Sequence, residues 1–163
     1  MFRARGSANG GVVIAQAYAS AVRTSLNSIV STPKDSDYVT LGSVTVPGGI
    51  MGPNSKLLII VDWSYSNSVN TKTMAVDFGG VNIGASTGTT SDAFKVMLEV
   101  QNMGSLTAQK THNAHTFGSA GARISGTVNT VNDAVLDFKC KWSIAVVETI
   151  TLIGYSVVHY PGR

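Results

Sequence analysis

The sequence is short of charge. Only 13% of its 163 residues are Asp, Glu, Lys or Arg, about half the share of roughly 25% found in ordinary soluble domains. Hydrophobic residues make up 44% of the chain, enough to build a core, so intrinsic disorder is excluded. Uncharged polar residues and glycine must cover most of the surface. Such a surface is typical of an extracellular β-protein or of a subunit whose faces pack against neighbours in an assembly.

Cysteine and long apolar runs are also scarce. Cys140 is the only cysteine, which excludes a framework of intrachain disulfides. Unbroken apolar stretches are short, as in Leu57–Val61, which is followed by Asp62. None approaches the roughly 18 residues that a membrane-spanning helix needs. The net charge is +3, but the basic residues are scattered apart from Arg3 and Arg5. We therefore expect neither a membrane nor a nucleic acid as partner.

Apolar and polar residues alternate with a period of two from Tyr38 onward, and Gly, Pro and Asn clusters separate the alternating runs. This pattern, without intervening amphipathic helices, predicts an all-β fold, an antiparallel β-sandwich or jelly roll over residues 37–163. The expected strands lie at Val39–Val46, Lys56–Tyr65, Met74–Phe78, Phe94–Val100, Leu136–Ile144 and Ile150–Val158. Cys140 falls on the apolar face of its run, so we expect its sulfur to be buried.

Residues 1–36 lack this alternation and are predicted to form an N-terminal arm. One helical stripe runs through part of the arm, formed by Ile14, Tyr18, Val22, Leu26 and Ile29, which favours a short helix. The β-branched and serine residues of Thr24–Thr32 favour an extended chain instead, and both alternatives stay open. The apolar residues of the arm are the candidate partner-binding residues, by strand addition or anchoring: Val12, Val13, Ile14 and Tyr18.

Motifs for catalysis or metal binding are weak. Gly84–Gly88 matches the G-x-S-x-G pattern of a nucleophile elbow, but no amphipathic helix follows it, as that turn requires. His112 and His115 lie in a loop-like segment far from His159, and their spacing does not match that of a metal site. We therefore predict that the protein is not an enzyme and binds neither cofactor nor metal.

Three polar residues at predicted strand ends have a structural interpretation. Lys72, Asn102 and Gln109 stand where strands meet loops. Polar side chains in such places satisfy buried backbone groups. We expect them to make structural hydrogen bonds.

The order of several short segments between Tyr38 and Tyr160 resembles small jelly-roll virion proteins of tailed bacteriophages. The segments are Pro47-Gly48-Gly49, Lys56-Leu57-Leu58-Ile59, Trp63, Asn70-Thr71-Lys72-Thr73, Phe78-Gly79-Gly80, Val100-Gln101-Asn102-Met103-Gly104-Ser105 and Gln109. Residues 1–36 lie outside the resemblance. It implies a capsid decoration (cement) protein, or a related head or tail accessory protein, which is commonly a trimer and has no catalytic residues.

On this hypothesis the partner is the major capsid protein or another virion protein, and the chain lies on the capsid surface as a homo-oligomer. The alternative is a recognition module, such as a tail-fibre or carbohydrate-binding β-sandwich. That function would need exposed aromatic side chains on which sugars stack, for which Trp63, Tyr65 and Tyr155 are the candidates. Because these aromatics lie in strand patterns, core packing is the competing interpretation.

Overall fold

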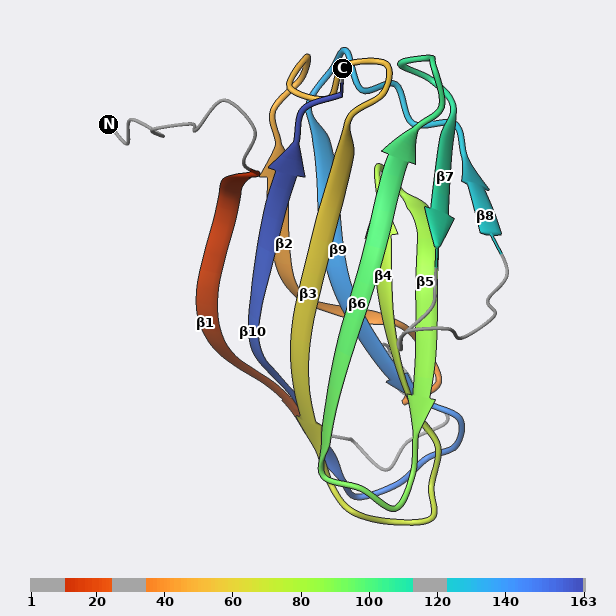
Figure 1. The fold of residues 1–163 in the computed structure, drawn as a ribbon. Coiled ribbons are helices and arrows are strands. Elements are labelled where there is room, and N and C mark those ends of the chain that lie inside the picture. Colours follow the sequence, from red (N-terminus) through yellow and green to blue (C-terminus); the bar gives the residue numbers. More distant parts are fainter. Residues whose placement is uncertain (1–10, 25–34, 113–122, 163) are drawn as a thin grey trace.

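The structure, a computed structural model, describes residues 11–24, 35–112 and 123–162. Every regular element in these ranges is a strand, and the strands form two antiparallel sheets stacked as two layers (Figure 1). The predicted all-β sandwich is confirmed. The strands are β1 (Val12–Thr24), β2 (Val39–Val46), β3 (Lys56–Tyr65), β4 (Lys72–Phe78), β5 (Val81–Gly88), β6 (Ala93–Asn102), β7 (Gln109–His112), β8 (Arg123–Gly126), β9 (Ala134–Trp142) and β10 (Thr149–Tyr160). A helix long and apolar enough to cross a bilayer does not occur in these ranges.

The strand order is that of a jelly roll. One sheet has the order β1-β10-β3-β6-β7-β8, and the other has the order β2-β9-β4-β5. Without the β7–β8 pair, which extends the first sheet, each sheet has four strands, and the first strand of the chain pairs with the last. This is the double-sheet arrangement of jelly rolls, a fold of viral capsid and lectin domains.

β1 lies in the segment that was predicted to be an arm. Its 13 residues pair with β10, from Val12 opposite His159 to Thr24 opposite Thr149. The helical alternative is therefore wrong for Val12–Thr24, which is an extended strand of the sandwich. Two register shifts interrupt its pairing, and each shift changes which residues face inward, so no regular alternation shows in the sequence. Residues 1–10 and 25–34 of the predicted arm lie outside the described residues.

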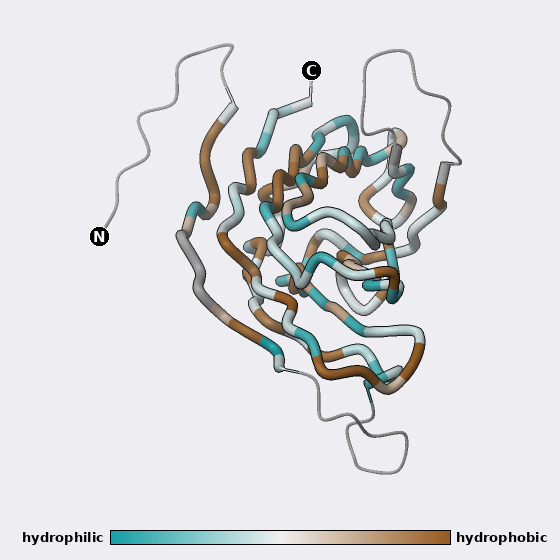
Figure 2. Tube along the Cα trace, turned by 90° about the horizontal axis from the view of Figure 1, so that it is seen from below, coloured by the Kyte–Doolittle hydropathy of each residue, from teal (hydrophilic) through white to brown (hydrophobic). Residues whose placement is uncertain are grey.

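The inner faces of the two sheets form one core. The alternation predicted for Leu136–Ile144 is confirmed as far as Trp142, because Leu136, Phe138, Cys140 and Trp142 are all fully buried. It is wrong for Ile144, which lies beyond the end of β9 and is 53% exposed. Seen along the strands, hydrophobic and hydrophilic segments alternate along the chain (Figure 2). Burial raises the pKa of the Cys140 thiol to about 11, against the opposing charge and hydrogen bond of Arg23. Cys140 is thus a core residue without a disulfide.

One glycine pair makes the tightest connection in the four-stranded sheet. Gly79 and Gly80 join β4 to β5 with φ angles of +54° and +79°. Two consecutive residues with positive φ are the requirement of a type I′ hairpin turn, which other residue types adopt at a cost. The turn signal in the sequence is confirmed.

The structural hydrogen bonds predicted for Asn102 and Gln109 are present where β6 turns into β7. The Asn102 amide donates to the carbonyl of Gly52 (3.0 Å) and to Thr130 Oγ1 (3.0 Å). The Gln109 amide donates to Asn102 Oδ1 (2.9 Å) and to the carbonyl of Val128 (2.9 Å). These bonds tie three loops together at one end of the sandwich.

Candidate functional site

Three loops meet at the opposite end of the sandwich, which we term the loop end. They are residues 66–71 between β3 and β4, residues 89–92 between β5 and β6, and residues 143–148 between β9 and β10. Backbone hydrogen bonds join them to one another and to neighbouring strands: Ser143 donates to the carbonyl of Thr71 (3.2 Å), and Ser68 donates to that of Thr89 (3.4 Å). The loop end is therefore one connected surface.

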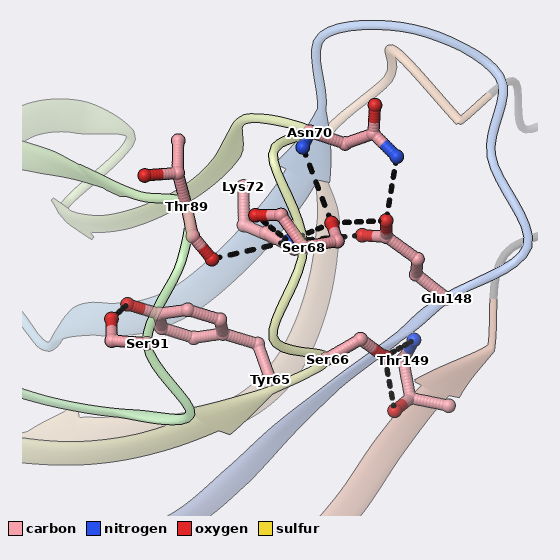
Figure 3. Close-up of polar contacts among 9 residues, drawn as sticks. All are labelled: Tyr65, Ser66, Ser68, Asn70, Lys72, Thr89, Ser91, Glu148 and Thr149. Carbon is pink, nitrogen blue, oxygen red and sulfur yellow. Dashed lines mark hydrogen bonds and ion pairs between the residues drawn. The ribbon is translucent and has the colours of Figure 1, made fainter.

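A buried ion pair lies under these loops, and we call it the Lys72–Glu148 clamp (Figure 3). Lys72 begins β4 and is 0% exposed, and its Nζ lies 3.1 Å from Oε2 of Glu148, which is 8% exposed. The Ser68 hydroxyl accepts a hydrogen bond from Lys72 (2.6 Å) and donates one to Glu148 Oε1. The Asn70 amide donates to the same oxygen (2.6 Å), and Lys72 also donates to the carbonyl of Thr89 (3.4 Å). One cation and one carboxylate thus hold all three loops.

The electrostatics of the clamp favour a structural role. Burial alone would raise the pKa of Glu148, but hydrogen bonds from Ser68, Asn70 and Lys72, together with the charge of Lys72, lower it below its ordinary value. The carboxylate therefore faces Lys72 as an anion. A lysine held in such an ion pair has no free lone pair with which to take a proton from Ser68. The structural hydrogen bonding predicted for Lys72 is confirmed.

The clamp should make folding sensitive to acid. The free energy of unfolding is expected to fall as the pH drops from the ordinary pKa of glutamate, about 4.3, through the lower pKa of folded Glu148. In that window the unfolded chain binds a proton that the folded chain does not, so acid favours unfolding. Above the window the contribution is complete.

Urea unfolding of the wild type and of Glu148→Gln, between about pH 7 and pH 3, measures this effect. Glu148→Gln should remove this part of the acid sensitivity. Glu99→Gln, at the exposed Lys56–Glu99 pair, is the control and should retain it. If Glu148→Gln and the wild type lose equal free energy of unfolding in acid, Glu148 does not cause this acid sensitivity.

The clamped loops present apolar side chains to solvent. Val69 is 80% exposed, Val147 is 77% exposed and Ile144 is 53% exposed. Among the residues of the three loops, all of which the structure describes, Asp92 is the only exposed charged one. Exposed apolar side chains at fixed positions on a surface with a single charged residue are typical of protein-binding sites.

A second apolar surface covers the outside of the six-stranded sheet, and we call it the outer face. Residues directly opposite each other in antiparallel strands point to the same side, so the register defines its rows. One row is Val13, Val158, Leu58 and Glu99, and the next is Gln16, Ser156, Ile60 and Met97. Its exposed or half-buried apolar side chains include Val13, Val22, Leu58, Ile60, Met97, Ile153 and Val158.

The candidate partner-binding residues of the sequence analysis are distributed over both sides of β1. Val13 is exposed on the outer face. Val12 is half-buried opposite His159, and Ile14 packs against the core. The backbone of Tyr18 pairs with Gly154, and its side chain lies outside the described residues.

The sequence analysis did not identify the three exposed residues at the loop end. Ile144 was predicted to end the strand Leu136–Ile144, but β9 ends at Trp142 and Ile144 lies in the loop that follows. Val69 and Val147 belong to no alternating run. Their signal in the sequence is an apolar residue in a loop that carries almost no charge, and that signal is weak because solitary exposed apolar residues are common.

The aromatic residues proposed for sugar stacking lie in the core. Trp63 is 1% exposed and Tyr65 is 4% exposed. Tyr155 is half-buried, and its ring centroid lies 4.7 Å from that of Phe138. The competing interpretation, core packing, is therefore correct for Trp63 and Tyr65, and the carbohydrate-binding alternative loses the platforms on which it depended.

The catalytic and metal-binding motifs can be placed as well. Ser86 of the G-x-S-x-G match lies within β5, and the next element is the strand β6, so the strand-to-helix turn is absent here. His159 is buried, whereas His115 and the side chain of His112 lie outside the described residues. In the ranges that the structure does describe, no three His, Cys, Asp or Glu side chains come together as metal ligands.

Comparisons with known proteins identify no family. No family model matches the sequence, and no curated protein matches it. The comparison with solved structures finds weak matches, which include the insecticidal delta-endotoxin Cry8Ea1 from Bacillus thuringiensis, with 12% identity and a TM-score of 0.41 over 76% of this chain and 18% of that chain. Dimeric latent PorU from Porphyromonas gingivalis has 10% identity and a TM-score of 0.42 over 98% of this chain and 14% of that chain.

A third structure is that of the infectious bursal disease virus Gx strain, with 12% identity and a TM-score of 0.32 over 96% of this chain and 43% of that chain. The chain spans less than half the length of each of these three. At these TM-scores and identities the likenesses assign the chain to no family.

Proposed function

We propose that this chain is a non-enzymatic structural subunit of a bacteriophage particle, a decoration protein that binds the capsid lattice from outside. Its partner is the major capsid protein or a neighbouring virion protein. The observation that carries the proposal is the loop end, where a buried ion pair fixes three loops that expose three apolar side chains and one charged residue, Asp92.

The fold and the composition support the same function. Jelly rolls build viral capsid domains, and the order of segments between Tyr38 and Tyr160 resembles phage virion proteins. Only 13% of the residues are charged, so the free-energy cost of removing charged groups from water is small when a protein lattice covers the surface of this chain. An enzyme would instead need reactive groups in a cleft. In this structure Lys72 donates a hydrogen bond to Ser68 and forms the buried ion pair with Glu148.

The clamp explains how loops can serve as a docking surface. Binding through mobile loops costs free energy, because each ordered side chain loses conformational entropy. The hydrogen bonds of Ser68, Asn70 and Thr89 to the clamp residues restrain two of the loops before binding, and Glu148 restrains the third. The loops therefore have a fixed conformation before binding, and their exposed side chains can enter apolar depressions of a partner. These side chains are Val69, Ile144 and Val147.

Binding to capsids that lack this protein tests the proposal. Full-length protein should bind such capsids, and Val69→Asp combined with Val147→Asp should weaken binding by at least about 100-fold, because each aspartate must be desolvated in an apolar contact. Occupancy is measured by sedimenting the capsids with increasing protein and quantifying the bound fraction.

Val131→Asp is the matched control. Val131 is also an exposed valine in a loop, 54% exposed, but it follows Thr130, which bonds to Asn102 at the opposite end of the sandwich. This variant should bind as the wild type does. If wild-type protein does not bind, or if the loop-end variant and the control bind equally, the proposed function is wrong.

A further inference from the structure

The outer face has a projecting residue between two depressions. In β10 the register shifts between Leu152 and Gly154, so Ile153 is an extra residue without a partner in β3. The pairing of β1 shifts at the same level. A bulge redirects the side chain at that position, and Ile153 is 42% exposed.

The depressions flank Ile153 on the same surface. One has a volume of about 260 Å³ and is lined by residues that include Ile60, Gln16 and Asp62. The other has a volume of about 410 Å³ and is lined by residues that include Phe94 and Asp62. Each is large enough for an aliphatic side chain, so a single face carries both a projection and the hollows that can receive one.

On the four neighbouring strands β1, β10, β3 and β6, the positive and negative charges of the outer face are equal in number. Asp62 and Lys95 form an ion pair at 3.2 Å, and Lys56 and Glu99 form another at 3.1 Å. On the described residues of these strands the outer face therefore has no net charge. Such a face matches neither a strongly acidic nor a strongly basic partner, but it matches a second copy of itself, in which each carboxylate can face an ammonium group.

The size of the face fits a stable dimer. β3 and β6 are each 10 residues long, and at about 3.3 Å per residue and about 4.8 Å per strand, four strands present a projected area on the order of 600 Å². Side-chain relief increases the accessible area toward the ~800 Å² that each partner buries in a standard interface.

From these observations we infer that the outer face is a two-fold interface between two copies of this chain, in which Ile153 of each copy enters a depression of the other. An isologous contact needs both complementary features on one surface, as found here. A trimer, which the family resemblance implied, would need a second, different surface to close. This inference goes beyond the proposed function, since self-association is measured on the purified chain without any capsid.

Sedimentation equilibrium and light scattering of the full-length protein test the inference. The wild type should have the mass of two chains at micromolar concentration. Ile153→Asp and, separately, Met97→Asp should raise the dissociation constant at least about 100-fold, because the two-fold places each substitution twice in one interface. Circular dichroism should show both variants folded, since both side chains are about 40% exposed on strands.

Val135→Asp is the matched control, because Val135 is equally exposed (40%) on β9, on the outside of the other sheet. It should leave the dimer intact. Ile153→Cys should cross-link into dimers with a short bis-maleimide, whereas Val135→Cys should not, and buried Cys140 should not react. A monomeric wild type, a trimer, or a dimer that persists in both Ile153→Asp and Met97→Asp would each overturn the interface.

Discussion

Replacing Phe138 by alanine is expected to lower the free energy of unfolding by about 3–5 kcal/mol. Phe138 is fully buried in the middle of β9, and its ring packs against Tyr155 from the opposite sheet. Removing the ring leaves a cavity between the sheets, because the structure around a deleted core side chain relaxes only in part. Because a domain of this size has a total stability of about 5–15 kcal/mol, the loss should be visible in both chemical and thermal unfolding.

Val135→Ala is the control on the same strand, because this side chain points away from the core and is exposed. It should change the free energy of unfolding by no more than about 0.5 kcal/mol. Equal losses for the two variants would mean that the inner and outer faces of β9 are assigned the wrong way round.

Replacing Lys72 by methionine is expected to cost about 3–5 kcal/mol, although methionine fills most of the space of the lysine stem. The cost arises because Glu148 stays buried while it loses the ammonium group of Lys72, and removing one partner of a buried ion pair is strongly destabilising. The pKa of Glu148 should rise in this variant, so its stability should fall at a higher pH than that of the wild type.

Lys56→Met provides a matched control at the same distance. The Lys56–Glu99 pair also has a 3.1 Å separation, but its side chains are 37% and 48% exposed. An ion pair in solvent contributes about 0–1 kcal/mol, so this variant should unfold almost as the wild type does. Urea unfolding at neutral pH measures both, and similar small losses would show that the Lys72–Glu148 clamp contributes little.

The sequence predicted the strands that alternate regularly, and the two-sheet architecture follows from them. In β9 every second residue from Leu136 to Trp142 is apolar and buried. In β6 the same holds for Val96, Leu98 and Val100. β1 was not recognised as a strand because its two register shifts break the alternation, and a helical stripe happened to fit the same residues. Its place beside β10 is set by tertiary pairing that no local pattern encodes.

The candidate site was predictable only in part. Lys72 stood out as a charged residue at the start of a strand, but its partner Glu148 is 76 positions away in the chain, and the loops meet only once the jelly roll has formed. The bulge at Ile153 is equally invisible, since it appears only in the register between β10 and β3. Composition and periodicity describe local features of a sequence, so they do not predict contacts or register shifts between distant segments.

Cryo-electron microscopy of capsids with added protein tests whether the loop end binds a capsid shell. We expect density for the sandwich outside the shell, oriented so that Val69, Ile144 and Val147 touch the lattice and the end near Asn102 points away from it. Capsids without added density, or sandwiches that touch the shell through the Asn102 end, would contradict binding through the loop end.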